Sequence, residues 1–147
     1  MDHKDYMRRA LELAAQAGAE GDVPVGCVIV RDGEIIGEGR NRREENGDAT
    51  AHAELEAIRD ACRRLGSWRL HRCTMYVTLE PCPMCAGGII NARIDRIYYG
   101  AGDEKAGCCG SVLNLFEERF NHHPRIYRGP LREECEAVLQ KFFEALR

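Results

Sequence analysis

Apolar and polar positions alternate along this chain with two different periods, one typical of helices and one typical of strands. Near the N-terminus, the helical period predicts a helix over residues 4–17 that ends at Gly18, with an apolar side formed by Tyr6, Ala10, Leu13, Ala14 and Ala17. Residues 25–40, VGCVIVRDGEIIGEGR, contain two β-rich segments joined by Asp32-Gly33, a strong signal for a two-residue hairpin turn. A polar loop over residues 41–48 follows.

The rest of the chain continues to alternate helices with strands. Further helices are predicted over residues 51–65, 82–92, 112–118 and 130–147. Further strands are predicted over residues 73–80, 94–100 and 125–129. This order predicts an α/β fold whose sheet is covered by helices on both faces. The hairpin makes the sheet mixed, because its two strands must run antiparallel.

Composition narrows the classes of protein to which the chain can belong. With 147 residues, 44% hydrophobic and 31% charged, we expect one globular domain over residues 1–147. No apolar run approaches the ~18 residues of a membrane span, and the charged N-terminus lacks the apolar core of a signal peptide. We therefore expect a cytoplasmic protein, in which eight cysteines are free thiols or metal ligands rather than a disulfide framework.

The strongest chemical signal comes from two short stretches. TAHAELEAI contains His52 and Glu54, and LEPCPMCAG contains Cys82 and Cys85 directly after Pro81. Catalytic zinc sites use three Cys, His or carboxylate ligands and keep a fourth position for water. His52 and the C-x-x-C pair each stand at the start of a predicted helix, where the partial positive charge favours a thiolate. The sequence therefore predicts one Zn²⁺ per chain, held by His52, Cys82 and Cys85.

Glu54 is the predicted proton carrier of this site. Because it follows His52 by two residues, it lies on another part of the first helical turn and reaches the open position without ligating the metal. Zinc lowers the pKa of a bound water to about 7, and a neighbouring carboxylate can pass that proton to a substrate nitrogen. A C-x-x-C or an H-x-E alone is often structural, but together they match the H-x-E…P-C-x-x-C signature of zinc deaminases.

Over nearly its whole length, the chain closely resembles the bacterial tRNA-specific adenosine deaminases of the cytidine-deaminase-like superfamily. The resemblance is carried by VPVGCVIV, GEGRNRRE, TAHAELEAIR, YVTLEPCPMCAGGIINARI, YYGAGDEKAGCCGS and NHHPRIYRG. It implies a three-layer α/β/α sandwich around a five-stranded mixed sheet. It also implies a homodimer that converts adenosine to inosine at the wobble position of a tRNA anticodon, usually of an arginine tRNA, with both subunits contacting the RNA.

The resemblance implies roles for residues outside the zinc motif. Asn41, in GRNR, matches an asparagine that hydrogen-bonds the flipped nucleoside, and Asp103, in GAGDEKAG, matches an acid near the ribose next to the target. Gly102 stands where many relatives have an arginine, which calls into question one cationic contact to the RNA backbone but not the chemistry.

Weaker candidates for RNA contact are Lys105, His122, Phe142 and Phe143. For His122 a loop role is the simpler interpretation, and for the phenylalanines helix packing, although one ring could stack on a base. Six arginines could form a phosphate-binding stripe or simply a solvated surface: Arg42, Arg43, Arg63, Arg64, Arg69 and Arg72. The pairs Cys108-Cys109 and His122-His123 fit no zinc template, so we expect no second metal site there.

Two other functions stay open beside the tRNA deaminase. A deaminase of a free base such as guanine or cytosine would use the same chemistry in a small closed pocket, and the net charge of −3 suits it. A non-catalytic zinc-binding module is the third, but structural sites normally have four protein ligands and no use for Glu54.

Overall fold

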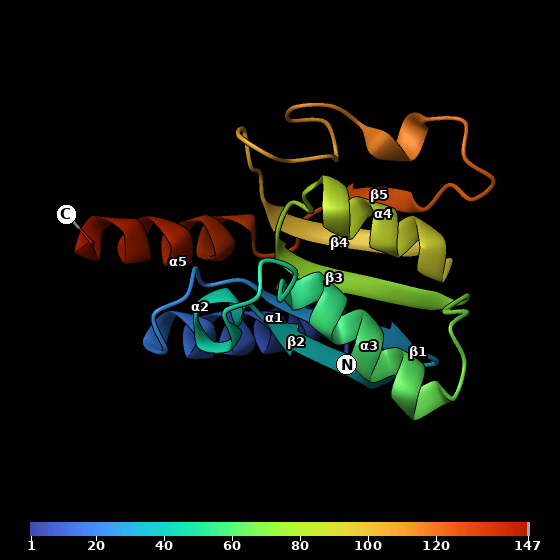
Figure 1. Cartoon of the computed structure of the whole chain (residues 1–147), viewed down its shortest axis with the longest axis horizontal. Coiled ribbons are helices and arrows are strands. Elements are labelled where there is room, and N and C mark those ends of the chain that lie inside the picture. The colour runs from blue at the N-terminus through green and yellow to red at the C-terminus, as the bar shows by residue number, and fades with distance from the viewer. Residues whose placement is uncertain (147) are drawn as a thin grey trace.

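The computed structural model describes residues 1–146 and contains one five-stranded sheet, in the order β2-β1-β3-β4-β5 (Figure 1). β1 is antiparallel to both β2 and β3, whereas β3, β4 and β5 are parallel to one another. The strands are β1 (Gly26–Arg31), β2 (Glu34–Arg40), β3 (Cys73–Leu79), β4 (Arg96–Ala101) and β5 (Arg125–Arg128). The predicted mixed sheet is confirmed.

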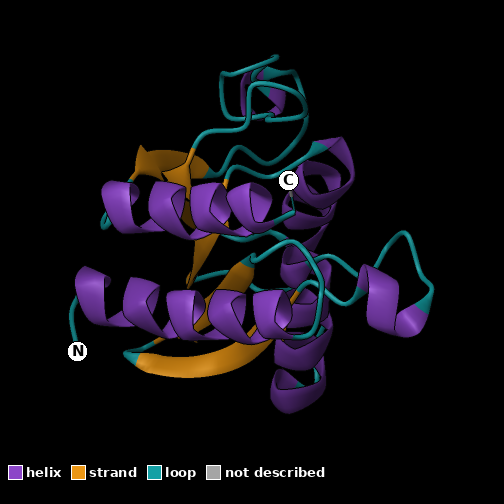
Figure 2. Cartoon of the chain, turned by 90° about the vertical axis from the view of Figure 1, so that its left-hand side faces the viewer, coloured by secondary structure: helices purple, strands orange, loops and turns teal. Residues whose placement is uncertain are grey.

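Helices cover both faces of this sheet (Figure 2). α1 (His3–Ala19) and α5 (Arg132–Ala145) lie side by side on one face, and α3 (Ala53–Leu65) and α4 (Pro83–Ala92) lie on the other. A short helix, α2 (Arg43–Asn46), and a 3-10 turn, η1 (Leu115–Glu117), lie in the connections. The layers confirm the predicted α/β/α sandwich. Within residues 1–146, no helix is long and apolar enough to cross a membrane.

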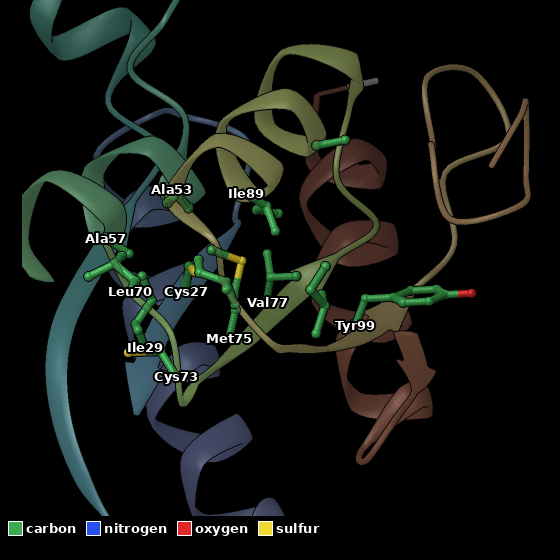
Figure 3. Close-up of a cluster of buried hydrophobic side chains, with 14 of the residues drawn as sticks. Cys27, Ile29, Ala53, Ala57, Leu70, Cys73, Met75, Val77, Ile89 and Tyr99 are labelled. Carbon is green, nitrogen blue, oxygen red and sulfur yellow. The ribbon is translucent and has the colours of Figure 1, made fainter. Parts of the chain in front are cut away.

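The larger core lies between the sheet and the helices α3 and α4 (Figure 3). Small side chains of α3 face the strands, which lets the helix approach them closely. A Cβ on Gly37 of β2 would lie 2.5 Å from the backbone oxygen of Ala57 in α3, and a Cβ on Gly39 would lie 2.2 Å from that of Ala53. The members of this core that Figure 3 labels are Cys27, Ile29, Ala53, Ala57, Leu70, Cys73, Met75, Val77, Ile89 and Tyr99. The close contact between α3 and β2 places the start of α3, and with it His52, against the sheet.

Two predicted boundaries at the first helix differ for local reasons. α1 begins at His3 because Asp2 and Asp5 form a capping box, in which each side chain accepts from the other's backbone N–H. It also continues through Gly18 to Ala19. A Cβ on Gly18 would lie 3.3 Å from the Cβ of Pro24, so this glycine permits a close approach rather than ending the helix.

Three other predicted segments need correction. The predicted loop over residues 41–48 contains α2, which Gly47 ends in the left-handed conformation with φ of 58°. The predicted helix over 112–118 is only the 3-10 turn η1, because the Asn114 side chain caps Phe116 and this short stretch buries Phe116 alone. The last helix starts at Arg132 rather than at residue 130, since Leu131 has φ of 58°.

Candidate active site

The three predicted zinc ligands come together beside the carboxyl end of β3. His52 is the N-cap residue of α3, Cys82 is the N-cap residue of α4, and Cys85 lies in the first turn of α4. His52 Nδ1 is 3.6 Å from Cys82 Sγ and 3.5 Å from Cys85 Sγ, and all three ligand atoms lie within 4.8 Å of one another. Tetrahedral zinc with bonds of about 2.0 Å to nitrogen and 2.3 Å to sulfur would separate its ligands by about 3.5–3.8 Å. The donor set therefore fits zinc.

Both helix starts leave the ligand side chains free to face each other. The backbone of His52 and Cys82 is extended, and neither side chain caps its own helix. The first N–H of α3, from Ala53, instead donates to Asn41 Oδ1 at 3.0 Å. Pro83 is the first residue of α4 and has no N–H that needs a partner. The two helices thus begin without using the groups that the metal would need.

The site favours a negatively charged sulfur. A hydrogen bond with the Cys85 thiol lowers the pKa of Cys82 to about 4, and a hydrogen bond with Cys82 raises the pKa of His52. The same hydrogen bond with Cys82, together with burial, raises the pKa of Cys85. The ligands must lose these protons when a metal binds, so metal affinity is linked to pH.

Glu54 lies in the first turn of α3, two residues after His52. Its side chain is buried and is not one of the converging ligand groups. Burial raises the pKa of Glu54 to about 7. A carboxyl group with a pKa in that range can both accept and donate a proton near neutral pH.

The pocket above these residues has a volume of about 490 Å³, within the range of small-molecule sites. The buried Glu54 and the half-buried His52 and Cys82 line it. The exposed lining residues form its rim: Lys105, in the loop after β4 beside the half-buried Asp103, and Phe143 from α5. The structure thus brings Lys105 and Phe143 to the pocket.

Asn41 also lines the pocket but serves the fold as well. Its Oδ1 accepts from Ala53 N, and its Nδ2 donates to the Val23 carbonyl at 3.1 Å. An asparagine amide has two donors and two lone pairs, so one N–H and one lone pair of Asn41 are left for a ligand.

The loop over residues 102–111 is held by Glu80, a buried carboxylate that sequence reasoning missed. Its oxygens accept from the backbone N–H groups of Asp103 at 3.0 Å, Cys109 at 2.8 Å and Ser111 at 3.1 Å, and from the Ser111 hydroxyl. Burial raises the pKa of Glu80, but these hydrogen bonds outweigh it and hold the pKa below its ordinary value. The available signal was an acid that follows an apolar strand directly, in YVTLEPC.

Gly107 makes this arrangement possible. A Cβ on Gly107 would lie 2.3 Å from the carboxyl carbon of Glu80, closer than any side chain permits. The loop is joined to the metal centre as well, because Cys108 N donates to the carbonyl of Pro81, the residue before Cys82, at 2.9 Å.

The two carboxylate oxygens of Asp103 differ in their contacts. Its Oδ1 accepts from the backbone N–H groups of Lys105 at 3.0 Å and Ala106 at 3.2 Å, which caps the turn. Its Oδ2 has no hydrogen-bond partner in the described part of the chain, and the residue lines the pocket. One oxygen of Asp103 is therefore free for a ligand.

Two of the weaker candidates lie away from the pocket. His122 Nε2 is 2.7 Å from the carbonyl of Ile94, before β4 begins and so at the opposite end of that strand. Phe142 points toward α1, with its ring 3.9 Å from the Cβ position of Gly18. Neither side chain lines the pocket.

The six arginines considered as a phosphate-binding stripe or a solvated surface differ in their contacts. Of these six only Arg43 lines the pocket. Arg63 and Arg64 form ion pairs with Asp60 on the same helix. In the pair Cys108-Cys109, which fits no zinc template, Cys108 is buried in the main core.

Known proteins match the chain over its whole length. The family model for MafB19-like deaminases matches residues 1–147. A tRNA-specific adenosine deaminase of Bacillus subtilis strain 168 is 48% identical over 143 residues, which span 97% of this chain and 89% of the relative.

Two solved structures have the same fold. One, from studies of A-to-I editing by tRNA:A34 deaminases at the wobble position, has a TM-score of 0.90 at 44% identity and covers 93% of this chain and 100% of that one. The guanine deaminase of Bacillus subtilis has a TM-score of 0.69 at 36% identity, and the match covers 100% of this chain and 94% of that one. The chain therefore belongs to the MafB19-like deaminases and, among them, to the family of tRNA-specific adenosine deaminases with the cytidine-deaminase-like fold.

Proposed function

We propose that this enzyme deaminates adenosine to inosine at the wobble position of a tRNA anticodon, in an arginine tRNA. The observation that carries the proposal is the convergence of His52, Cys82 and Cys85 near the buried acid Glu54, beside a pocket that His52, Cys82 and Glu54 line. The relatives named above as tRNA-specific adenosine deaminases support the substrate, because they match nearly the whole chain.

We assign one zinc ion per chain to His52, Cys82 and Cys85, whose ligand atoms are spaced as zinc requires. When bound, zinc supplies a Lewis acid that makes a water molecule acidic near neutral pH. The partial positive charges of two helix starts support the negative sulfurs of the site.

Glu54 moves the protons of the reaction. Its carboxylate accepts one proton from the attacking water and gives it to a ring nitrogen as the water oxygen bonds to the ring carbon. It then takes the second proton of that water, from the hydroxyl now on the carbon, and gives it to the amine, which leaves as ammonia while the carbonyl forms. Water and adenosine are consumed, and inosine and ammonia are formed. Burial of Glu54 keeps bulk water away from the proton that it carries.

The other pocket residues hold the nucleoside. We propose that the free N–H of Asn41 donates to the flipped nucleoside and that the free oxygen of Asp103 accepts from a ribose hydroxyl. Phe143 presents an exposed ring beside the pocket, on which a base can stack, and Lys105 supplies a cation at the rim. The partner is thus a tRNA anticodon stem-loop, and we propose a cytoplasmic homodimer of single-domain subunits.

The free-base alternative is not favoured. The tRNA-specific relative in Bacillus subtilis is 48% identical to this chain, and the guanine deaminase of the same species is 36% identical. The tRNA:A34 deaminase structure also superposes with the higher TM-score, 0.90 against 0.69.

Incubation of the purified protein with an arginine tRNA that carries an A-C-G anticodon tests the proposal. We expect inosine at the first anticodon position by sequencing, and none with the Glu54→Gln variant as the matched control. Free guanine, cytosine and adenosine are offered in parallel. Rapid turnover of a free base, with the tRNA unchanged, would contradict the proposal and favour the alternative.

A further inference from the structure

Arg128 lies next to the pocket, and the catalytic scheme gives it no role. It is an exposed residue of the edge strand β5 and is paired with Tyr99 of β4 in the sheet. Its guanidinium lies over the Tyr99 ring, with the central carbon 5.4 Å from the ring centre. Its Nε donates to the Gly100 carbonyl at 3.3 Å. These two contacts hold the guanidinium in one orientation at the end of β4.

The terminal nitrogens of this guanidinium stand against the pocket rim. A Cβ on Gly102 would lie 3.2 Å from one terminal nitrogen of Arg128 and 3.5 Å from the other. Gly102 lines the pocket and has no side chain to separate Arg128 from it. Across residues 1–146, Arg128 forms no ion pair; its Nε donates to the Gly100 carbonyl, and its guanidinium also interacts with the Tyr99 hydroxyl. The guanidinium has five N–H donors, so terminal N–H groups are left for a ligand.

The charged residues of the pocket rim bear on what these nitrogens can bind. The residues that follow Gly102 are Asp103, Glu104 and Lys105, and all three line the pocket, so two carboxylates stand there against one ammonium. A nucleotide in the pocket brings its flanking phosphates to this acidic rim, where like charges repel. A cation beside the rim offsets that repulsion, and the planar fork of an arginine matches the oxygens of a phosphate.

We propose that Arg128 binds a backbone phosphate of the RNA, next to the nucleotide that occupies the pocket. The proposal rests on the proposed function, because it takes RNA as the substrate. Tyr99 and the Gly100 carbonyl orient the side chain before RNA arrives, so little conformational entropy is lost on binding.

The test compares Arg128→Gln, Arg128→Lys and the control Arg125→Gln in the zinc-loaded protein. Arg125 is exposed on the same strand but lies at its other end, beside Asp95, so its loss removes the same charge far from the pocket. Binding of an arginine tRNA anticodon stem-loop is measured over a range of salt concentrations, with KM and kcat from inosine formation.

We expect Arg128→Gln to weaken binding about tenfold at low salt and to reduce the slope of log affinity against log salt by about one. We expect Arg128→Gln to raise KM by a larger factor than it lowers kcat. Arg128→Lys keeps the slope but loses part of the affinity, because a single ammonium lacks the fork.

Arg125→Gln should match wild type in both quantities. Equal slopes and KM values for Arg128→Gln and Arg125→Gln, with wild type active on the tRNA, would overturn this inference alone. If wild type neither binds nor deaminates the tRNA, the proposed function fails and this inference fails with it.

Discussion

The metal centre and the loop over residues 102–111 are two parts of one pocket, and they are built in opposite ways. The ligands of the metal centre stand on two helix starts that pack against the sheet. The loop lacks helix and strand; one buried carboxylate, Glu80, accepts four hydrogen bonds from it, and the Asp103 cap and the bond from Cys108 N to Pro81 add to these. The metal centre is thus positioned by the packing of two helices, and the loop by hydrogen bonds to a buried carboxylate.

The metal centre and the loop also differ in the roles assigned to their residues. The groups assigned to proton transfer and metal binding lie in rigid elements, where small displacements would cost activity. Of the groups assigned to the RNA, Asp103 and Lys105 lie in the loop, whereas Phe143 lies on α5 and Arg128 on β5. Damage to the helix starts should therefore abolish turnover, whereas damage to the loop should weaken the handling of RNA and spare the chemistry.

Removal of a zinc ligand gives the largest expected effect. In Cys85→Ala the buried donor set loses one of its three members, so we expect the zinc content to fall well below one ion per chain and inosine formation to disappear. Metal analysis of the purified variant and a single-turnover assay measure both. The assignment fails if the variant keeps full zinc and full activity.

Glu54→Gln should come next in size and should leave the metal in place. Glutamine keeps the shape of the side chain but removes the oxygen that accepts a proton. General acid–base catalysis contributes roughly 10²–10⁴-fold, and we expect a loss of single-turnover rate in that range. Zinc content and thermal unfolding should match wild type. A rate close to wild type would mean that another group carries the proton.

Glu80→Gln tests the loop side of the comparison. The amide turns one acceptor into a donor that faces backbone N–H groups, so two or more of the four hydrogen bonds are lost. We expect faster hydrogen exchange over residues 102–111, a free energy of unfolding lower by about 1–3 kcal/mol, and an effect on KM for tRNA larger than that on kcat.

Ser111→Ala serves as the matched milder variant of that experiment, since it removes only the hydroxyl donor to Glu80. Its effects should go in the same direction and be smaller. Should Glu80→Gln lose zinc while the loop keeps its protection, Glu80 would belong to the metal centre and the division drawn above would be wrong.

The same contrast explains what the sequence could predict. Local sequence patterns predict the alternation of helices and strands and the choice of zinc ligands. α2 and η1 were missed or overextended because each depends on one or two capping contacts, at Gly47 and at Asn114. Glu80 and Arg128 act across distant segments, and no local period reveals a contact between residues 80 and 111 or between residues 128 and 102.

Asp103 gives the smallest expected effect, a change in the choice between RNA and DNA. The chemistry at adenine does not depend on the sugar, so a preference for RNA must come from contacts to the 2′-hydroxyl or to RNA shape. One oxygen of Asp103 caps its own turn, and the other is free to accept from that hydroxyl. In DNA the hydroxyl is missing, and the carboxylate lies unpaired near phosphates that repel it.

Asp103→Asn separates these two tasks, because an asparagine oxygen can still cap the turn while the negative charge is gone. We expect the loop and the zinc content to stay as in wild type, RNA deamination to fall, and deamination of adenine in single-stranded DNA to rise relative to RNA by about five- to tenfold, the equivalent of one hydrogen bond. Rates on matched RNA and DNA stem-loops measure the ratio. Asp103→Ala is the control for the capping role, since it removes the cap together with the charge and should also loosen the loop. If the DNA-to-RNA ratio of the folded, zinc-loaded Asp103→Asn variant equals that of wild type, Asp103 serves the turn alone and the discrimination against DNA lies with other residues of the pocket.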